Sequence, residues 1–181
     1  IFFDEASEKW RWDIDNMHKL DITDNVVELM VNKIRKCSPE AQKNLMLSSC
    51  IGHEFSLRSL SWITNEQSLP SLMEALDQGL ISPTDDNYLL LNDPDQRALL
   101  YQDKEEEEGK EQIDAGFRFL HDRVQQAAYS QLSGHDREST HLKLGQKLLV
   151  RTPDLEKSEH IFEICNHINL GHSQIDDQNT R

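Results

Sequence analysis

The chain is short of positive charge and of long apolar runs, and each shortage excludes a class of protein. Its 181 residues include 33 acidic and 19 basic side chains, giving a formal net charge of -14 at pH 7. Nucleic acids and anionic lipids are bound through Lys and Arg, so this balance disfavours nucleic acid and favours protein partners. No apolar run approaches the ~20 residues of a membrane-spanning helix, and the mean hydropathy is -0.69. We therefore expect no membrane insertion and a cytoplasmic location.

Cysteines are also few. The three, Cys37, Cys50 and Cys165, are far apart in helical patterns, which predicts buried free thiols in a reducing compartment. Cys37, Cys50 and His53 could contribute to a zinc site, since Cys50 and His53 have C-x-x-H spacing, but a fourth ligand is missing and Cys37 lies on a helix face, so we expect no metal. The chain opens on apolar residues without a Met or a basic segment, which predicts a piece of a larger protein with no signal peptide.

Motifs for phosphate binding and for catalysis are missing. The chain lacks G-x-x-x-x-G-K-[ST], since its Gly109-Lys110 pair is followed by Glu111, and it lacks G-x-S-x-G. His53, His121-Asp122 and Asp136 follow the H…HD…D order of metal phosphohydrolases, but eight histidines produce such orders by chance. We expect a non-catalytic segment that binds no metal and no triphosphate by itself.

Hydrophobic spacing predicts a mainly α chain that begins with a β-hairpin over residues 1–13. Helices are predicted from their start and stop residues over 23–34, 39–51, 56–63, 68–78, 122–132, 135–150 and 158–170. Strands are predicted at Tyr88–Leu91 and Phe117–Phe119, as the two sides of a wing.

This order is that of a winged-helix-like helical domain with a small β-wing, followed by the start of a helical, TPR-like repeat array. We assign the hairpin to residues 1–20, the winged helix to 21–133, its acidic wing insertion to about 92–115 and the repeats to 134–181. The acidic block Asp103–Glu108 is predicted to be a solvated loop. The candidate recognition helix, Leu69–Gln78, contains Glu74 and Asp77 but no Lys or Arg, which disfavours DNA.

The most informative stretch is GFRFLHDRVQQAAYSQL, residues 116–132, where a β-like run meets an amphipathic helix. His121, Asp122 and Arg123 lie at this junction. A helix start presents unpaired N–H groups and a partial positive charge, which suit a phosphate. Alternatively, His121 caps the helix or pairs with a carboxylate, and Asp122 only favours the helix dipole.

Four segments carry a resemblance, TDNVVELMVNKI, LMLSSCIGHEFSL, FRFLHDRVQQAAY and IFEICNHINLG. Together they resemble the predicted ATPase region of large multidomain serine/threonine and hybrid histidine kinases. In that family an AAA-like or STAND domain, a signal-transduction ATPase, is followed by a winged helix, helical repeats, and sensor and kinase modules. The resemblance extends from Trp10 to Gly171, and it implies that residues 1–20 are the end of the upstream ATPase module.

The resemblance implies that ATP or ADP is bound mainly by upstream residues and that the chain relays the nucleotide state to the repeats and kinase modules. By match to the family's His-Asp pair, His121 contacts a phosphate and Asp122 orients the backbone. Arg123 adds charge or forms a surface ion pair. The implied partners are the ATPase core and the helical repeats of the same protein. The alternative is a purely structural or protein-interaction module without nucleotide contact.

Overall fold

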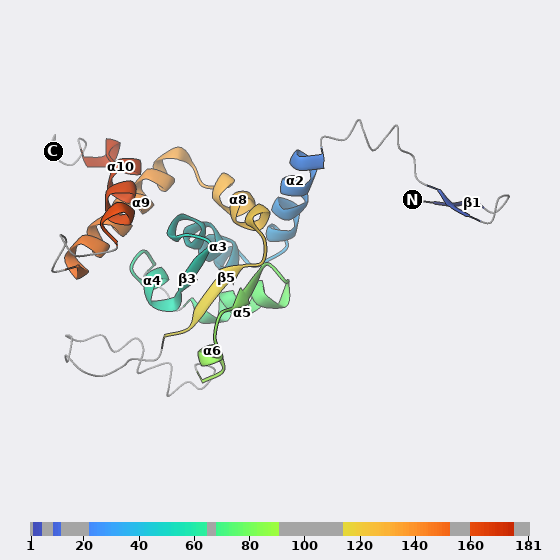
Figure 1. Cartoon of the computed structure of the whole chain (residues 1–181), viewed down its shortest axis with the longest axis horizontal. Coiled ribbons are helices and arrows are strands. Elements are labelled where there is room, and N and C mark those ends of the chain that lie inside the picture. The colour runs from blue at the N-terminus through green and yellow to red at the C-terminus, as the bar shows by residue number, and fades with distance from the viewer. Residues whose placement is uncertain are drawn as a thin grey trace.

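The structure, a computed structural model, describes residues 2–4, 9–11, 22–64, 68–90, 114–152 and 160–175. The first two ranges are strands β1 (Phe2–Asp4) and β2 (Lys9–Arg11), which pair antiparallel as the predicted hairpin. The rest is mainly helical with one small sheet (Figure 1). The acidic block 103–108 lies outside the described residues. No helix in the described ranges has the length and apolar character needed to cross a membrane.

Helices α2 (Ile22–Ile34) and α3 (Pro39–Ile51) lead into the folded part. The hydroxyl of Ser38 accepts a hydrogen bond from the Ala41 N–H, and Pro39 opens α3, which confirms the predicted helix start. Ser38 also donates through its backbone N–H (2.8 Å) and its hydroxyl (2.5 Å) to the carboxylate of Glu74. These bonds hold the pKa of Glu74 below its usual value. Glu74 lies in a later helix, α5 (Leu69–Asp77), so these bonds join that helix to the start of α3.

The sheet has three antiparallel strands in the order β3-β5-β4. They are β3 (Glu54–Ser56), β4 (Ile81–Pro83) and the central β5 (Gly116–Phe119). The pairing sets Phe55 opposite Phe117 and Ile81 opposite Phe119. The strand predicted around Phe117 is confirmed, whereas β3 is a strand that the sequence pattern did not predict.

The strand predicted at Tyr88–Leu91 is wrong. Asn87–Leu90 form a short helix, α6, and residue 91 lies outside the described ranges. The carboxylate of Asp85 accepts the Asn87 N–H at 2.9 Å and so turns the chain. Its other oxygen accepts the Gly116 N–H, also at 2.9 Å, so the same side chain fixes the start of β5.

Two short helices lie between β3 and β4. In α4 (Leu57–Ser61), Ser56 and Ser59 form a capping box, as expected from a helix that starts at Ser56. In α5 (Leu69–Asp77), Gly79 has φ +61°, and its N–H and that of Leu80 bond to the carbonyls of Leu76 and Ala75. This is the predicted left-handed helix stop, and it delivers Leu80 to the core and Ile81 to the sheet.

The core lies between the sheet and helices α2, α3, α4, α5 and α8 (Asp122–Ser130). Phe55 packs on Phe117 and Phe119 with ring centroids 6.0 and 5.5 Å apart. Burying a phenylalanine ring contributes about 2–3 kcal/mol to folding. The fully buried leucines that surround these rings come from α3, α4 and α5 and are Leu45, Leu60, Leu69 and Leu72.

Residues at the end of the acidic insertion belong to the folded part. The carboxylate of Asp114 accepts the Arg58 N–H at 3.1 Å, and the carbonyl of Ala115 accepts the Leu57 N–H at 3.0 Å. Ala115 is fully buried. The connection therefore rejoins the domain at Asp114, against the start of α4.

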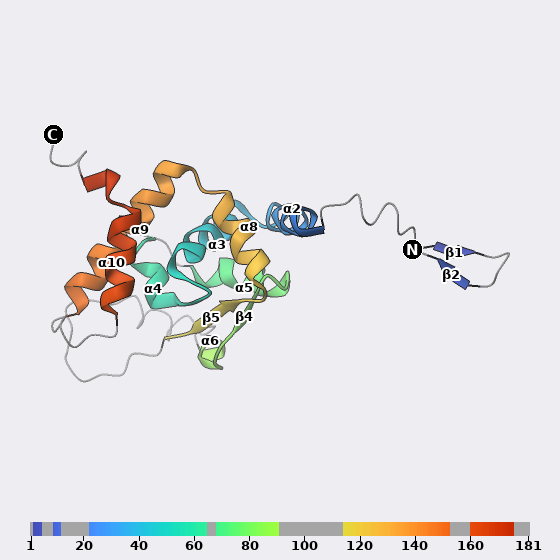
Figure 2. The ribbon, with the colours of Figure 1, turned by 45° about the horizontal axis from the view of Figure 1, so that its top comes forward.

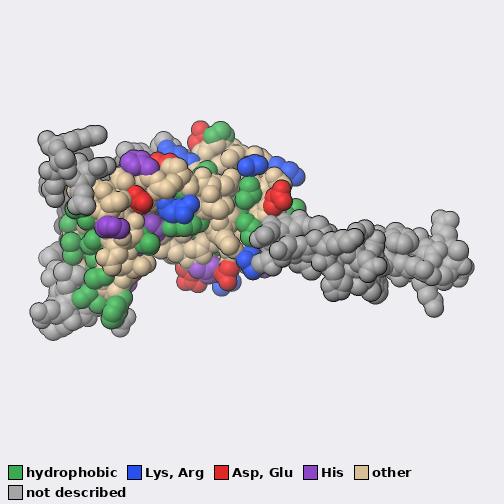
Figure 3. Space-filling view, turned by 90° about the horizontal axis from the view of Figure 1, so that it is seen from above, with side chains coloured by type: hydrophobic (Ala, Val, Ile, Leu, Met, Phe, Trp, Pro, Cys, Tyr) green, Lys and Arg blue, Asp and Glu red, His purple; other side chains and the backbone are tan. Residues whose placement is uncertain are grey.

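The three remaining helices are α8 (Asp122–Ser130), α9 (Gly134–Arg151) and α10 (Ile161–Leu170). Helix α8 lies on α2 and α3, while α9 and α10 pack side by side at the far end from α2 (Figure 2). The chain leaves α10 at Gly171. Exposed apolar side chains gather at this end of the molecule (Figure 3), among them Val150 and Phe162.

The three cysteines are free thiols, as predicted. Burial raises the pKa of the Cys50 thiol to about 12, and Cys37 is buried too. Cys165 is exposed on α10, so its predicted burial is wrong: it lies beside the buried Ile164 but on the outer face of the helix. In the described ranges, no three His, Cys, Asp or Glu side chains are grouped so that they could hold a metal ion.

Candidate functional site

The predicted site lies where β5 passes into α8. On one side the Phe119 N–H donates to the carbonyl of His53, and on the other the Leu120 N–H donates to the carbonyl of Leu80, both at 3.0 Å. Phe119 is buried, which anchors the end of the strand in the core. The backbone that leads to His121 is therefore fixed by the turn after α3 and by the stop of α5.

His121 occupies the N-cap position of α8. Its backbone is extended (φ -148°, ψ 150°), and its carbonyl accepts the Val124 N–H at 2.9 Å. Its imidazole makes no capping hydrogen bond and is exposed. Of the roles left open by the sequence, side-chain capping is thus not used, and the ring is available to a ligand.

Asp122 is the neighbour whose side chain pairs with another residue. Its Oδ1 lies 3.4 Å from Nδ1 of His53, and the two side chains are 93% and 45% exposed. An exposed pair of this kind contributes roughly 0–1 kcal/mol. It brings His53, from the loop before β3, to the junction. Of the residues in the H…HD…D order, His53 and the His121-Asp122 pair thus lie together at the junction. Asp136 lies in the first turn of α9, where its carboxylate accepts the Ser133 hydroxyl.

Arg123 lies on the surface of α8. Its Nη1 donates to Oε1 of Gln126 at 2.7 Å, one turn along the helix. The side chain is exposed, and this contact is a hydrogen bond to a neutral amide. The start of α8 thus holds all three predicted residues, but the side chain of Arg123 points along the helix toward Gln126.

The junction is an open surface. His121, Asp122 and Arg123 are all exposed. Two hollows lie elsewhere, between α9 and the α3–α4 region. Such a surface cannot enclose a nucleotide by itself, but it can complete a site whose other wall belongs to a separate domain.

The opposite end of α8 is connected to both C-terminal helices. The hydroxyl of Tyr129 lies 3.0 Å from Nε2 of His141 on α9, whose Nδ1 lies 2.9 Å from Nδ1 of His167 on α10. The guanidinium of Arg137 lies over the Tyr129 ring, 4.5 Å from its centroid. A neutral imidazole has one N–H, so the hydrogen bonds through His141 run in one direction from α8 to α10 or the reverse.

Both imidazoles are buried, and burial is the main reason why their pKa values are lowered. The pKa of His141 falls to about 4, with further lowering by His167 and Arg137. The pKa of His167 is also lowered by burial, against an opposing effect of Glu163. The pair is therefore neutral at pH 7. No sequence pattern marks this pair as functional, since both histidines lie among the apolar positions of their helices.

The chain is similar to part of a known signalling protein. It is 29% identical over 223 aligned residues to the hybrid signal transduction histidine kinase G of Dictyostelium discoideum. The alignment covers 100% of this chain and 6% of the relative, so the chain spans a small part of that kinase. No family model matches the chain, and no solved structure matches it significantly. The similarity supports a segment of a signal-transduction protein.

Proposed function

We propose that this chain is a non-catalytic regulatory segment of a longer signalling protein. In it, His121 and Asp122 face a nucleotide held by upstream residues, and α8 passes the nucleotide state to α9 and α10. The similarity to a hybrid histidine kinase along the whole chain supports the signalling context. We also propose a winged-helix identity for the central part, which the order α3, β3, α4, α5, β4, β5 and the strand order β3-β5-β4 support.

One observation carries the proposal. The exposed, uncapped imidazole of His121 begins the same helix whose last turn holds Tyr129, and Tyr129 bonds to His141. Eight residues of helix separate the two ends, which is about 12 Å at 1.5 Å per residue. A short helix moves as a rigid body, and both ends of α8 are bonded to neighbouring elements. A ligand that shifts the start of α8 therefore also shifts its end.

In this proposal His121 donates a hydrogen bond to a terminal phosphate oxygen. The phosphate lies near the start of α8, where the helix dipole favours negative charge. Asp122 pairs with His53 and keeps the first turn of α8 in place beside the loop before β3. The nucleotide shifts the population between two positions of the segment because it bonds to His121 in only one of them.

The test is ADP binding by a longer protein that includes the residues preceding Ile1. Replacing His121 with Ala removes one hydrogen bond to a charged group, so we expect the Kd for ADP to rise about tenfold. Isothermal titration calorimetry measures it. The matched control is His135→Ala, because His135 is also an exposed histidine in the first turn of a helix. Equal ADP affinity of the His121→Ala variant and the parent protein would refute the nucleotide contact.

The second candidate function is a protein-interaction module without nucleotide contact. The exposed apolar side chains of the C-terminal helices, Val150 and Phe162 in particular, favour it, since both are more than four-fifths exposed (82% and 84%). The two candidates differ in one respect, because only the regulatory segment couples His121 to a nucleotide.

A further inference from the structure

A stripe of positive charge runs along α9. Lys143, Lys147 and Arg151 follow one another at four-residue intervals, so they lie on one face of the helix. Like charges at this spacing destabilise a helix slightly. The stripe is unusual in a chain with a net charge of -14, and it needs a reason other than helix stability.

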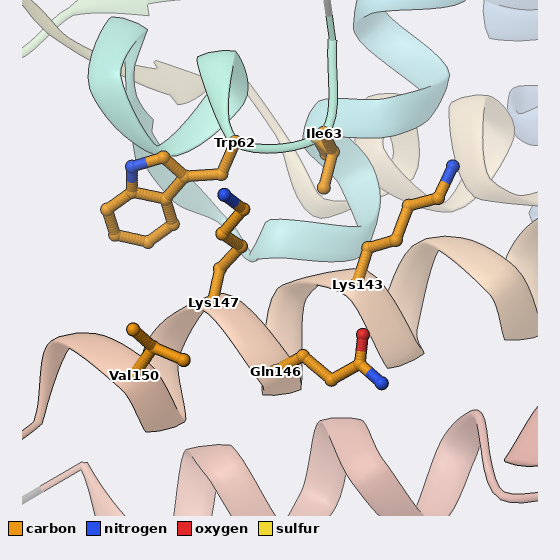
Figure 4. A pocket seen from close by; sticks show the side chains of 6 residues that line it. All are labelled: Trp62, Ile63, Lys143, Gln146, Lys147 and Val150. Atoms are coloured by element: carbon orange, nitrogen blue, oxygen red, sulfur yellow. The ribbon is translucent and has the colours of Figure 1, made fainter. Parts of the chain in front are cut away.

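The stripe borders a hollow of about 430 Å³ between α9 and the end of α4. Figure 4 shows Lys143 and Lys147 reaching from α9 toward Trp62 and Ile63, with Gln146 and Val150 beside them. A second hollow of about 500 Å³ continues along α9. It shares Ile63 and Lys143 with the first and adds side chains of α3, namely Lys43, Met46 and Leu47. We call the two together the α9 groove.

The charges in the α9 groove are unbalanced. Asp136 is the acidic residue among those lining the two hollows, and its Oδ2 accepts the Ser133 hydroxyl at 2.6 Å. At the other end the guanidinium of Arg151 lies over the Trp62 ring, 5.2 Å from its centroid. Lys143 and Lys147 are exposed, and neither forms a hydrogen bond or ion pair within the described ranges. The groove thus offers two available ammonium groups beside an aromatic and aliphatic wall.

We propose that the α9 groove binds an acidic peptide segment of a protein partner. Carboxylates of the peptide pair with Lys143 and Lys147, and an apolar side chain lies against Trp62 and Ile63. From Asp136 to Val150 the groove follows α9 for about 21 Å at 1.5 Å per residue, the length of about six extended residues. Nucleic acid, which also binds Lys, is disfavoured by the net charge of -14. The proposal is independent of the nucleotide contact at His121.

The probe is a fluorescein-labelled peptide, Glu-Glu-Glu-Leu-Glu-Glu-Glu, titrated with this chain and followed by fluorescence anisotropy. We expect saturable binding that weakens with salt, and no binding of the same peptide with Gln in place of Glu. The variant Lys143→Glu/Lys147→Glu turns two attractions into repulsions, so its Kd should rise at least about tenfold. Thermal unfolding by circular dichroism establishes that the variant is folded.

The matched control is Arg35→Glu/Lys36→Glu, which changes the net charge equally at exposed residues just after α2, away from α9. It should bind the peptide as the parent chain does. Equal weakening in both double variants would refute the groove as the site. A third protein, in which the acidic residues of 103–108 are replaced by their amides, tests whether the chain's own acidic block occupies the groove. If the peptide binds only after this change, the acidic block is the occupant and the proposal is overturned. Unchanged binding supports a separate partner.

Discussion

At the scale of single residues, the chemistry of His141 depends on the fold. It is 4% exposed, and its two nitrogens lie beside Tyr129 and His167. Protonation would place a positive charge in this buried site, near His167 and Arg137.

We therefore predict that folding stability falls with acidity. The pKa of His141 is about 4 in the folded chain, below the ordinary value of 6.5, and it is lowered by burial, His167 and Arg137. The unfolded chain thus binds more protons between these values, so stability is complete above pH 6.5 and is lost as the pH falls toward 4. The loss approaches about 3 kcal/mol. Urea unfolding at pH 7.0, 5.5 and 4.5 measures it.

The control for this pH effect is His141→Gln. Carboxylates also titrate in acid, so the parent chain alone cannot identify the group responsible. The variant should be less stable at pH 7 because it leaves His167 without its partner, but it should lose less stability between pH 7.0 and 5.5. An identical pH dependence in the variant and the parent chain would exclude His141 as the source.

At the scale of elements, the central strand β5 depends on one glycine. A Cβ on Gly116 would overlap Oγ1 of Thr84 and would lie 2.9 Å from a carboxylate oxygen of Asp85. The Gly116 carbonyl also accepts the Thr84 N–H at 2.9 Å, so these groups are held close together. The strand and the turn after β4 therefore meet at a place with no room for a side chain.

We predict that Gly116→Ala lowers the free energy of unfolding by about 1–3 kcal/mol, the usual cost of forcing a methyl group into a packed site. The matched control is Gly134→Ala, since a Cβ at Gly134 would have no atom within 4 Å and the residue opens α9. That change should be neutral or slightly stabilising. Urea unfolding measures the free energy of unfolding of both variants. Similar values for the two would contradict the close approach of Thr84 and Asp85 to Gly116.

Elements defined by local chemistry could be predicted from sequence, and those defined by distant partners could not. The stop of α5 follows from Gly79 alone, because the left-handed conformation suits glycine. By contrast, β3 has three residues, and its partner β5 lies some sixty residues further along the chain. The Asp85 carboxylate that turns Asn87–Leu90 into a helix is also held by distant Gly116.

The candidate site shows the same division. The junction at His121 could be predicted because a strand period changes to a helix period within a few residues. Its contact with His53 could not, because it arises from the pairing of β3 with β5. Nor could the Tyr129–His141–His167 connection, since histidines at apolar helix positions resemble ordinary buried residues.

At the scale of the whole molecule, α8 links two parts of the chain. Its start belongs to the sheet junction, and its end bonds to His141 on α9. The two C-terminal helices are held tightly together, because a Cβ on Gly145 would lie 2.8 Å from Cγ1 of Ile168 and one on Gly171 would lie 2.7 Å from the carbonyl of Glu138. A displacement of α8 should therefore move α9 and α10 as one unit.

The most direct test is hydrogen exchange of α10 amides, residues 161–170, in the longer protein with and without ADP. We predict that saturating ADP changes the exchange rates of these amides and that His121→Ala abolishes the change at ADP concentrations that saturate the variant. Exchange in α10 that is the same with and without bound ADP, or that responds equally in the His121→Ala variant, would contradict the relay.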